Sequence, residues 1–158
     1  MIKKIAFAAM LAIVACSASA QVRPSFYVGA DVGSTKIDGL SGHQSSFGGF
    51  AGYQFNQNFA VEAGYRRLAD FDNVTVNQTH ASVIGIVPLQ SGFNVYGRLG
   101  YNNLDTKANS GYTANLGTGV LYGVGVGYDF TPTIAVRVEA QKPSSDSSNV
   151  GASLALKF

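Results

Sequence analysis

The last nine residues, from Val150 to Phe158, place the strongest constraint on how this chain can fold. Successive side chains of a strand point to opposite faces. One face of this stretch is wholly apolar, and the other is small or charged: Val150, Ala152, Leu154, Leu156 and Phe158 against Gly151, Ser153, Ala155 and Lys157. In water such a stripe would be a sticky edge, whereas a closed barrel in lipid leaves no edge and covers the stripe with acyl chains. The stretch favours that barrel, and an ordinary half-buried terminal strand is the alternative.

The first twenty residues have the pattern of a secretory signal peptide. Two lysines precede an apolar run that ends at Cys16, and a small-residue cleavage site follows at Ala18 to Ala20. The run is shorter than the ~20 residues that a transmembrane helix needs. We therefore expect a cleaved signal peptide at 1–20 and one barrel domain at 21–158. The alternative is a lipoprotein in which Cys16 is lipidated, although the leucine usual at the start of that motif is missing.

Charge is scarce and balanced in the predicted mature chain. Charged residues make up 13% of the sequence, against about 25% in typical soluble domains. The net charge of +2 comes from Lys3 and Lys4, because eleven basic residues less these two leave nine, against nine acidic ones. No basic surface for nucleic acid is expected. No run of 18 apolar residues occurs after the first twenty residues, so no transmembrane helix is predicted there.

Eight segments alternate between apolar and polar side chains, as strands with two different faces do. The alternation is clear in seven of them, but Ile84 and Ile86 blur it in the fourth. The segments span residues 25–34, 45–55, 59–69, 78–87, 93–101, 116–130, 134–142 and 150–158. Short and longer connections alternate between them, which is the plan of a membrane barrel. We predict an all-β fold, an eight-stranded antiparallel up-and-down transmembrane β-barrel. A soluble barrel of lipocalin type would need polar residues outside, and here the small and charged residues form the minority face.

Several short motifs together resemble one family. They are residues 26–33, 52–55, 59–65, 95–101, 123–130 and 136–139, with the final Phe158. The chain is similar to the small eight-stranded outer-membrane barrels that include the OmpA-like transmembrane domain and the opacity-type proteins. The resemblance implies a monomer in the Gram-negative outer membrane, in contact with lipid and lipopolysaccharide and inserted by periplasmic chaperones and the barrel-assembly machinery. In that family the chain end forms the assembly signal, here Leu154, Leu156 and Phe158. No peptidoglycan-binding domain follows, so cell-wall anchoring is not implied.

Eight charged residues fall on the predicted inner faces, four acidic and four basic: Asp31, Glu62, Arg66, Arg98, Asp129, Arg137, Glu139 and Lys157. An eight-stranded barrel is so narrow that side chains fill it. Unpaired charges there would be costly, so these groups should pair. We expect a structural salt-bridge network in which Glu62 pairs with Arg98 or Arg137. A narrow ion or solute pore is the alternative.

Catalytic and cofactor motifs are weak. His80 and Ser82 have the spacing of the pair used by one family of outer-membrane lipid A deacylases. The strand phase turns both inward, and no acidic partner for the histidine is evident. His43 is the only other histidine and has no metal-ligand spacing. The alternating glycines of residues 123–127 lack the following helix that a dinucleotide loop requires. We expect a non-enzymatic barrel with an envelope-structural or surface-interaction role, without metal or cofactor.

We predict that Phe158→Ser lowers the yield of folded barrel, because the resemblance assigns the last residue to recognition by the assembly machinery. The measurement is the amount of heat-modifiable protein in outer-membrane fractions. A normal yield would contradict the assignment.

Overall fold

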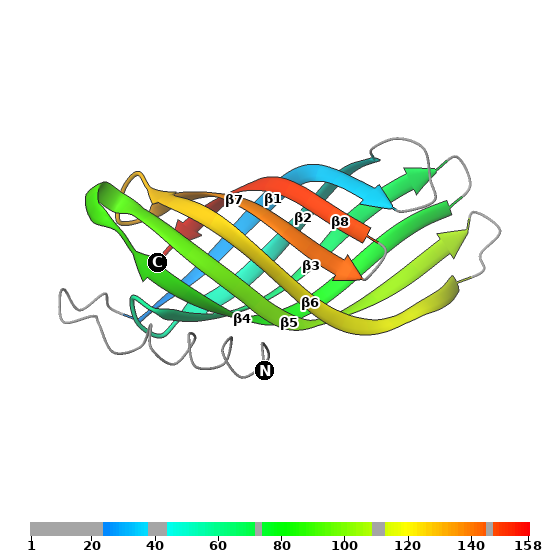
Figure 1. The fold of residues 1–158 in the computed structure, drawn as a ribbon, viewed down its shortest axis with the longest axis horizontal. Helices are drawn as coiled ribbons and strands as arrows, with labels where there is room; N and C mark the ends of the chain where they lie inside the picture. The colour runs from blue at the N-terminus through cyan, green and yellow to red at the C-terminus, as the bar shows by residue number, and fades with distance from the viewer. Residues whose placement is uncertain (1–23, 38–43, 72–73, 109–112, 145–146) are drawn as a thin grey trace, which may run out of the picture.

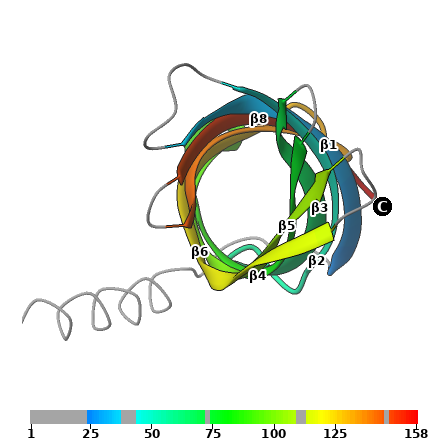
Figure 2. The same cartoon turned by 90° about the vertical axis from the view of Figure 1, so that its right-hand side faces the viewer.

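The computed structural model describes residues 24–37, 44–71, 74–108, 113–144 and 147–158. Eight strands form one closed barrel in sequence order, each antiparallel to the next, and the first pairs with the last (Figures 1 and 2). The strands are β1 (Ser25–Ile37), β2 (Gln44–Gln54), β3 (Phe59–Phe71), β4 (Val74–Pro88), β5 (Phe93–Ala108), β6 (Thr113–Asp129), β7 (Ile134–Ser144) and β8 (Ser147–Lys157). A short 3-10 turn, η2 (Gln90–Gly92), joins β4 to β5. The predicted fold class is confirmed.

Within the described ranges, no helix is long and apolar enough to cross a membrane. The predicted signal peptide lies outside the described residues, as does His43.

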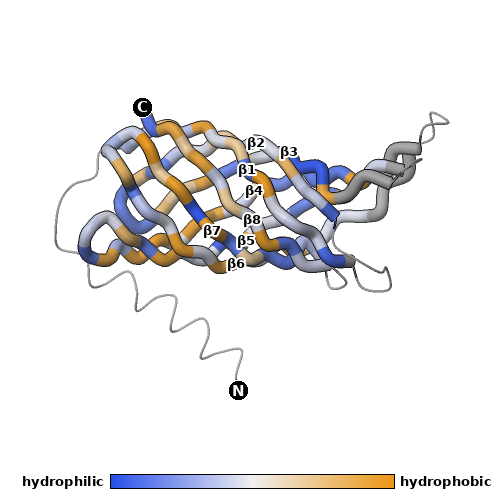
Figure 3. Tube along the Cα trace, turned by 90° about the horizontal axis from the view of Figure 1, so that it is seen from above, coloured by the Kyte–Doolittle hydropathy of each residue, from blue (hydrophilic) through white to orange (hydrophobic). Residues whose placement is uncertain are grey.

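The two faces of each strand differ as the alternation predicted. On β6, Val124 is 68% exposed and points outward. Leu121, three residues earlier and therefore on the other face, points inward and is fully buried. The hydropathy colours in Figure 3 alternate in the same way along the strands. A large apolar area thus faces outward, where only acyl chains can cover it without cost.

In β4, where the sequence pattern was blurred, side chains also alternate between the outer and the inner face of the barrel. Val83 is 52% exposed, and Ile84 points inward with 1% exposure. Ile84 packs with Ala60, Ala135 and Ala155 in a small apolar cluster inside the barrel. The isoleucine blurs the sequence pattern because the lumen near the short turns is itself apolar.

The strands are longer than predicted at the ends away from the short turns. β4 begins at Val74 instead of residue 78, and β5 ends at Ala108 instead of residue 101, because these two segments remain paired along their whole length. The added end of β5 has polar residues on both faces, so periodicity could not reveal it, whereas the first four residues of β4 do alternate and the prediction missed them. β5 and β6 have 16 and 17 residues, but β7 and β8 have 11 each. The barrel wall is therefore taller on one side.

Inward-facing aromatic rings lie over glycines of the neighbouring strand. Tyr27 on β1 is paired with Gly52 on β2, and Tyr96 on β5 with Gly125 on β6. A Cβ added at either glycine would overlap the ring of its tyrosine. Glycine at these places allows a large ring to lie flat across the wall in a narrow lumen.

This packing predicts opposite outcomes for two glycines on adjacent strands. Gly125→Ala would put a methyl group 2.7 Å from the Val138 carbonyl oxygen and into the Tyr96 ring, whereas a Cβ at Gly97 meets nothing within 4 Å. Overpacking typically costs about 1–3 kcal/mol. Gly125→Ala should therefore lower the free energy of unfolding in lipid by that order, and the control Gly97→Ala should leave it nearly unchanged. If the two substitutions lowered the free energy of unfolding equally, the difference in packing between Gly125 and Gly97 would be contradicted.

Candidate functional site

The six residues expected to form the salt-bridge network all lie on inner faces of the strands. Their strands are β1 for Asp31, β3 for Glu62 and Arg66, β5 for Arg98, and β7 for Arg137 and Glu139. Asp31, Glu62, Arg66 and Arg98 are buried, and Arg137 and Glu139 are partly buried. Period-2 alternation was enough to place them, because an inward phase on one residue fixes the phase of its whole strand.

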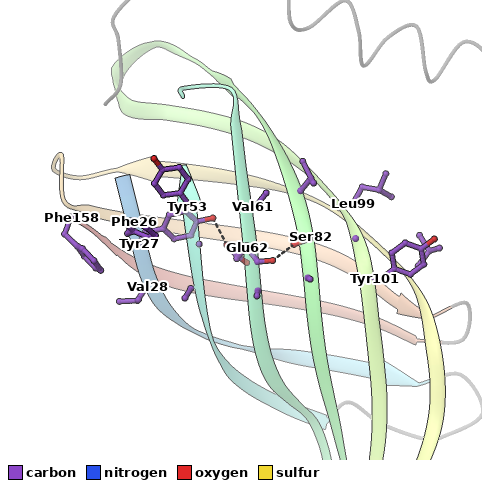
Figure 4. Close-up of a pocket in the computed structure, with 17 residues that line it drawn as sticks. Phe26, Tyr27, Val28, Tyr53, Val61, Glu62, Ser82, Leu99, Tyr101 and Phe158 are labelled. Carbon is purple, nitrogen blue, oxygen red and sulfur yellow. Dashed lines mark hydrogen bonds between the residues drawn. The ribbon is translucent and has the colours of Figure 1, made fainter. Parts of the chain in front are cut away.

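Glu62 is the centre of the first cluster. Its Oε1 lies 2.7 Å from Nη2 of Arg98, and its Oε2 lies 2.9 Å from Nη1 of Arg137. The Tyr27 hydroxyl donates to Oε2 at 3.1 Å (Figure 4). The structure therefore brings Glu62 into contact with both arginines, where the sequence predicted one or the other. One carboxylate joins β3 to β5 and β7 across the lumen.

Arg98 joins two carboxylates. Its Nε and Nη2 donate to Glu139 at 2.7 and 3.1 Å, and its Nη1 donates to Ser82 Oγ at 2.8 Å. Glu139 also accepts a hydrogen bond of 2.9 Å from the Tyr96 hydroxyl. Charge-assisted, two-pronged contacts of this kind are among the stronger hydrogen bonds in proteins. They hold the guanidinium group in one orientation.

Arg137 lies among aromatic rings as well as beside Glu62. Its Cζ is 4.8 Å from the ring centroid of Tyr27 and 5.7 Å from those of Phe50 and Tyr96. A cation near the faces of such rings is attracted by their quadrupoles. Sequence reasoning missed these aromatics as members of the site. Their signal was an aromatic residue on the inner face of a strand otherwise lined by small or polar side chains.

A second cluster, held together by hydrogen bonds, lies closer to the strand ends that are opposite the short turns. Arg66 Nε contacts Asp31 Oδ1 at 2.6 Å, and Arg66 Nη1 donates to Asn149 Oδ1 at 3.1 Å. Asn149 in turn donates to the hydroxyls of Thr35 and Ser46 at 2.8 and 2.7 Å. Asp31 and Arg66 are therefore paired with each other. Uncharged members such as Asn149 gave no charge signal in the sequence.

The last two inward charges form a separate pair at the short-turn mouth. Lys157 Nζ lies 2.8 Å from Asp129 Oδ1, and the Asp129 side chain is 39% exposed. Such a pair in contact with water contributes little to stability.

His80 and Ser82 lie inside the barrel, as the strand phase predicted. Both side chains are buried. The Ser82 hydroxyl accepts a hydrogen bond from Arg98, and His80 Nε2 lies 3.9 Å from Glu62 Oε1. An acidic neighbour is therefore present, although the sequence did not reveal it. The barrel wall nevertheless separates the pair from lipid A acyl chains outside. Among the described residues, no group of three or more His, Cys, Asp or Glu side chains could hold a metal ion.

The comparisons with known proteins agree with this architecture. Residues 6–158 match the family described as outer membrane protein beta-barrel domain. The chain belongs to this family. Its members are barrels of the outer membrane, which places this protein there as well. The comparison with curated proteins finds no match.

Solved structures show the same fold at low sequence identity. The N-terminal β-barrel domain of Pseudomonas aeruginosa OprF is 18% identical, with a TM-score of 0.63 over 84% of this chain and 97% of that one. Neisserial surface protein A is 24% identical, with a TM-score of 0.59 over 84% and 97%. Ail, the attachment invasion locus protein of Yersinia pestis, is 17% identical, with a TM-score of 0.54 over 85% and 97%.

The Glu62 contacts predict thermodynamic coupling across the lumen. Breaking one partner of a buried pair can cost about 3–5 kcal/mol, a figure that water in the lumen lowers. Glu62→Gln should therefore lower the free energy of unfolding, and Arg98→Gln should cost less in the Glu62→Gln background than in the unmodified protein. A double-mutant cycle from urea unfolding in lipid measures this coupling.

The exposed pair provides a matched control. Asp129→Asn and Lys157→Gln should show a coupling below about 1 kcal/mol. If Glu62 and Arg98 also behave additively, and Arg137→Gln gives the same result, then the contacts do not stabilise the barrel.

Proposed function

We propose that this protein is a closed, non-enzymatic outer-membrane barrel that stabilises the envelope and presents its taller wall to the exterior. The Glu62 cluster, consisting of Glu62, Arg98, Arg137 and Glu139, closes the lumen as a plug. The observation that carries this proposal is the small space left beside the plug. A cavity of about 20 Å³ lies there, which holds about one water molecule and not a hydrated ion.

The taller wall supports a surface-interaction role. The pairing of β4 with β5 continues from Pro88 to Val74, and that of β5 with β6 from Phe93 to Lys107. At ~3.3 Å of rise per residue, even when tilted by ~45°, strands of this length exceed the ~30 Å hydrocarbon core. Their far ends would stand in the lipopolysaccharide headgroups or above them. A hairpin wall that rises beyond the lipid is available to macromolecules outside the cell.

The lipid-facing side carries features that suit outer-leaflet lipid. Arg67 lies on the outer face of β3, with its Cζ 5.3 Å from the ring centroid of Phe47. A guanidinium group next to an aromatic ring fits the boundary between acyl chains and phosphate groups. We include lipopolysaccharide among the partners on this ground. Export by a signal peptide cleaved after Ala20, insertion by chaperones and the assembly machinery, and a monomeric state complete the proposal. The intact mass of the mature protein tests the cleavage site.

A narrow pore is the second candidate, and one observation favours it. A cavity of about 150 Å³ opens at the short-turn mouth and reaches Arg137, with Asp129 and Lys157 in its lining. The interior is thus wide enough for solute below the plug. In this reading the Glu62 cluster would be a filter that ions pass. A lipid A hydrolase using His80 and Ser82 is the third candidate, and lipid A mass spectrometry tests it.

Single-channel recording in planar bilayers distinguishes the plug from the pore. We expect near-zero conductance for the unmodified protein and measurable conductance for Glu62→Gln, because loss of the carboxylate releases two arginines from the lumen axis. Steady conductance of the unmodified protein would replace the plug by the pore. In cells, deletion of the gene should increase the permeability of the envelope to large hydrophobic solutes.

A further inference from the structure

We propose that His80 is a proton-binding site that opens the plug when the exterior becomes acidic. Protonated His80 competes with Arg98 for Glu62 and weakens the contact between them. The inference rests on the proposed plug and adds a trigger to it.

His80 is placed where one proton can disturb the plug directly. Its Nε2 lies 3.9 Å from Glu62 Oε1, the same oxygen that Arg98 Nη2 contacts at 2.7 Å. Its Nδ1 is buried and has no hydrogen-bond partner among the described residues. A neutral imidazole can remain beside the plug without disturbing the contact between Glu62 and Arg98. A protonated ring has two donors and a positive charge, so it turns toward the carboxylate that Arg98 already occupies.

The charges around His80 are balanced as long as the ring is neutral. The cavity beside the plug is lined by His80 and by three acidic and three basic side chains of the described strands: Asp31 of β1, Glu62 and Arg66 of β3, Arg98 of β5, and Arg137 and Glu139 of β7. β4 itself carries no other ionisable residue. A proton on His80 therefore adds a positive charge without a free counter-charge. The added repulsion acts on Arg98 and Arg137, the two groups that close the lumen.

Among the ionisable side chains around this cavity, His80 is the residue type that suits a response to pH. Histidine is the side chain whose ordinary pKa puts its charge change between about pH 5 and 8, whereas arginine stays charged and carboxylates are ionised throughout that range.

Polar side chains continue from His80 toward the strand ends that lie opposite the short turns. Gln78 lies two residues along the same face of β4, and Asn102 on β5 is paired with His80. Gln78 Oε1 and Nε2 and Asn102 Oδ1 are buried without a hydrogen-bond partner among the described residues. Buried polar groups are nearly always satisfied, by water where protein partners are lacking. Protons are therefore expected to reach His80 from this polar side of the barrel. On the opposite side, the apolar cluster around Ile84 lines the lumen, and the cavity at the short-turn mouth reaches Arg137.

The test is single-channel recording at about pH 7.5 and about pH 5.5, values that lie on either side of the ordinary histidine pKa. We expect the conductance of the unmodified protein to rise several-fold when the bath on the tall-wall side is acidified. His80→Gln, which keeps a polar side chain but cannot gain a proton, should show no such rise. His43→Gln removes the other histidine and should respond like the unmodified protein.

A second readout covers the case in which no channel opening is detected. The urea midpoint of unfolding in lipid should fall on acidification by more in the unmodified protein and in His43→Gln than in His80→Gln. His80→Asn serves as the neutral variant if His80→Gln does not insert. The proposal is overturned if the unmodified protein gives the same conductance and the same midpoint at both pH values. It is also overturned if the neutral variant keeps the full response. Steady conductance already at pH 7.5 would instead overturn the plug itself.

Discussion

The pairing of β1 with β8 is the constraint on which the rest of the structure depends. Eleven residue pairs, from Tyr27 with Lys157 to Ile37 with Ser147, close the sheet on itself. Lipid offers no hydrogen-bond partner to a strand edge, so an open sheet of these segments would leave costly backbone groups in the membrane. Once the seam is closed, the outer face must be apolar and the inner face must fit a narrow tube. The glycines beside Tyr27 and Tyr96 and the charges around Glu62 follow from that geometry.

The interior combines two kinds of filling. Near the short turns it is apolar, around Ile84, and farther along it is polar and charged. Because the charged groups form pairs, the interior gains no net charge that would attract ions or resist burial. The pairs also connect strands that are not neighbours in the sheet, such as β3 with β7 through Glu62 and Arg137. Side chains therefore brace the tube across its width, whereas backbone hydrogen bonds act only around its circumference.

The sequence was sufficient for the features that depend on one strand at a time. Alternation gave the strand number, the faces and the inward position of Glu62 and Arg98, because a period of two leaves no freedom once one residue is placed. Features that depend on several strands were not predictable in the same way. Which arginine contacts Glu62 depends on the stagger between strands. In the structure both Arg98 and Arg137 contact it. The placement of Arg137 among Tyr27, Phe50 and Tyr96 likewise needs residues of four strands, β1, β2, β5 and β7, at one height. The end of β5 was missed because polar residues lie on both faces there.

The contacts inside the lumen have a consequence for the order of assembly. Glu62 and Arg98 belong to strands that are available early, but Arg137 comes from β7 and Asn149 from β8, 75 and 83 residues after their partners Glu62 and Arg66. Arg98 and Asp31 can pair with Glu62 and Arg66 earlier, but the hydrogen bonds of both clusters stay incomplete until the final hairpin arrives. A partly assembled sheet would therefore carry incompletely satisfied polar groups toward a hydrocarbon surface. This penalty works against release of the unfinished barrel into the bilayer, so the polar lumen acts as a checkpoint that favours membrane release only after the seam has closed.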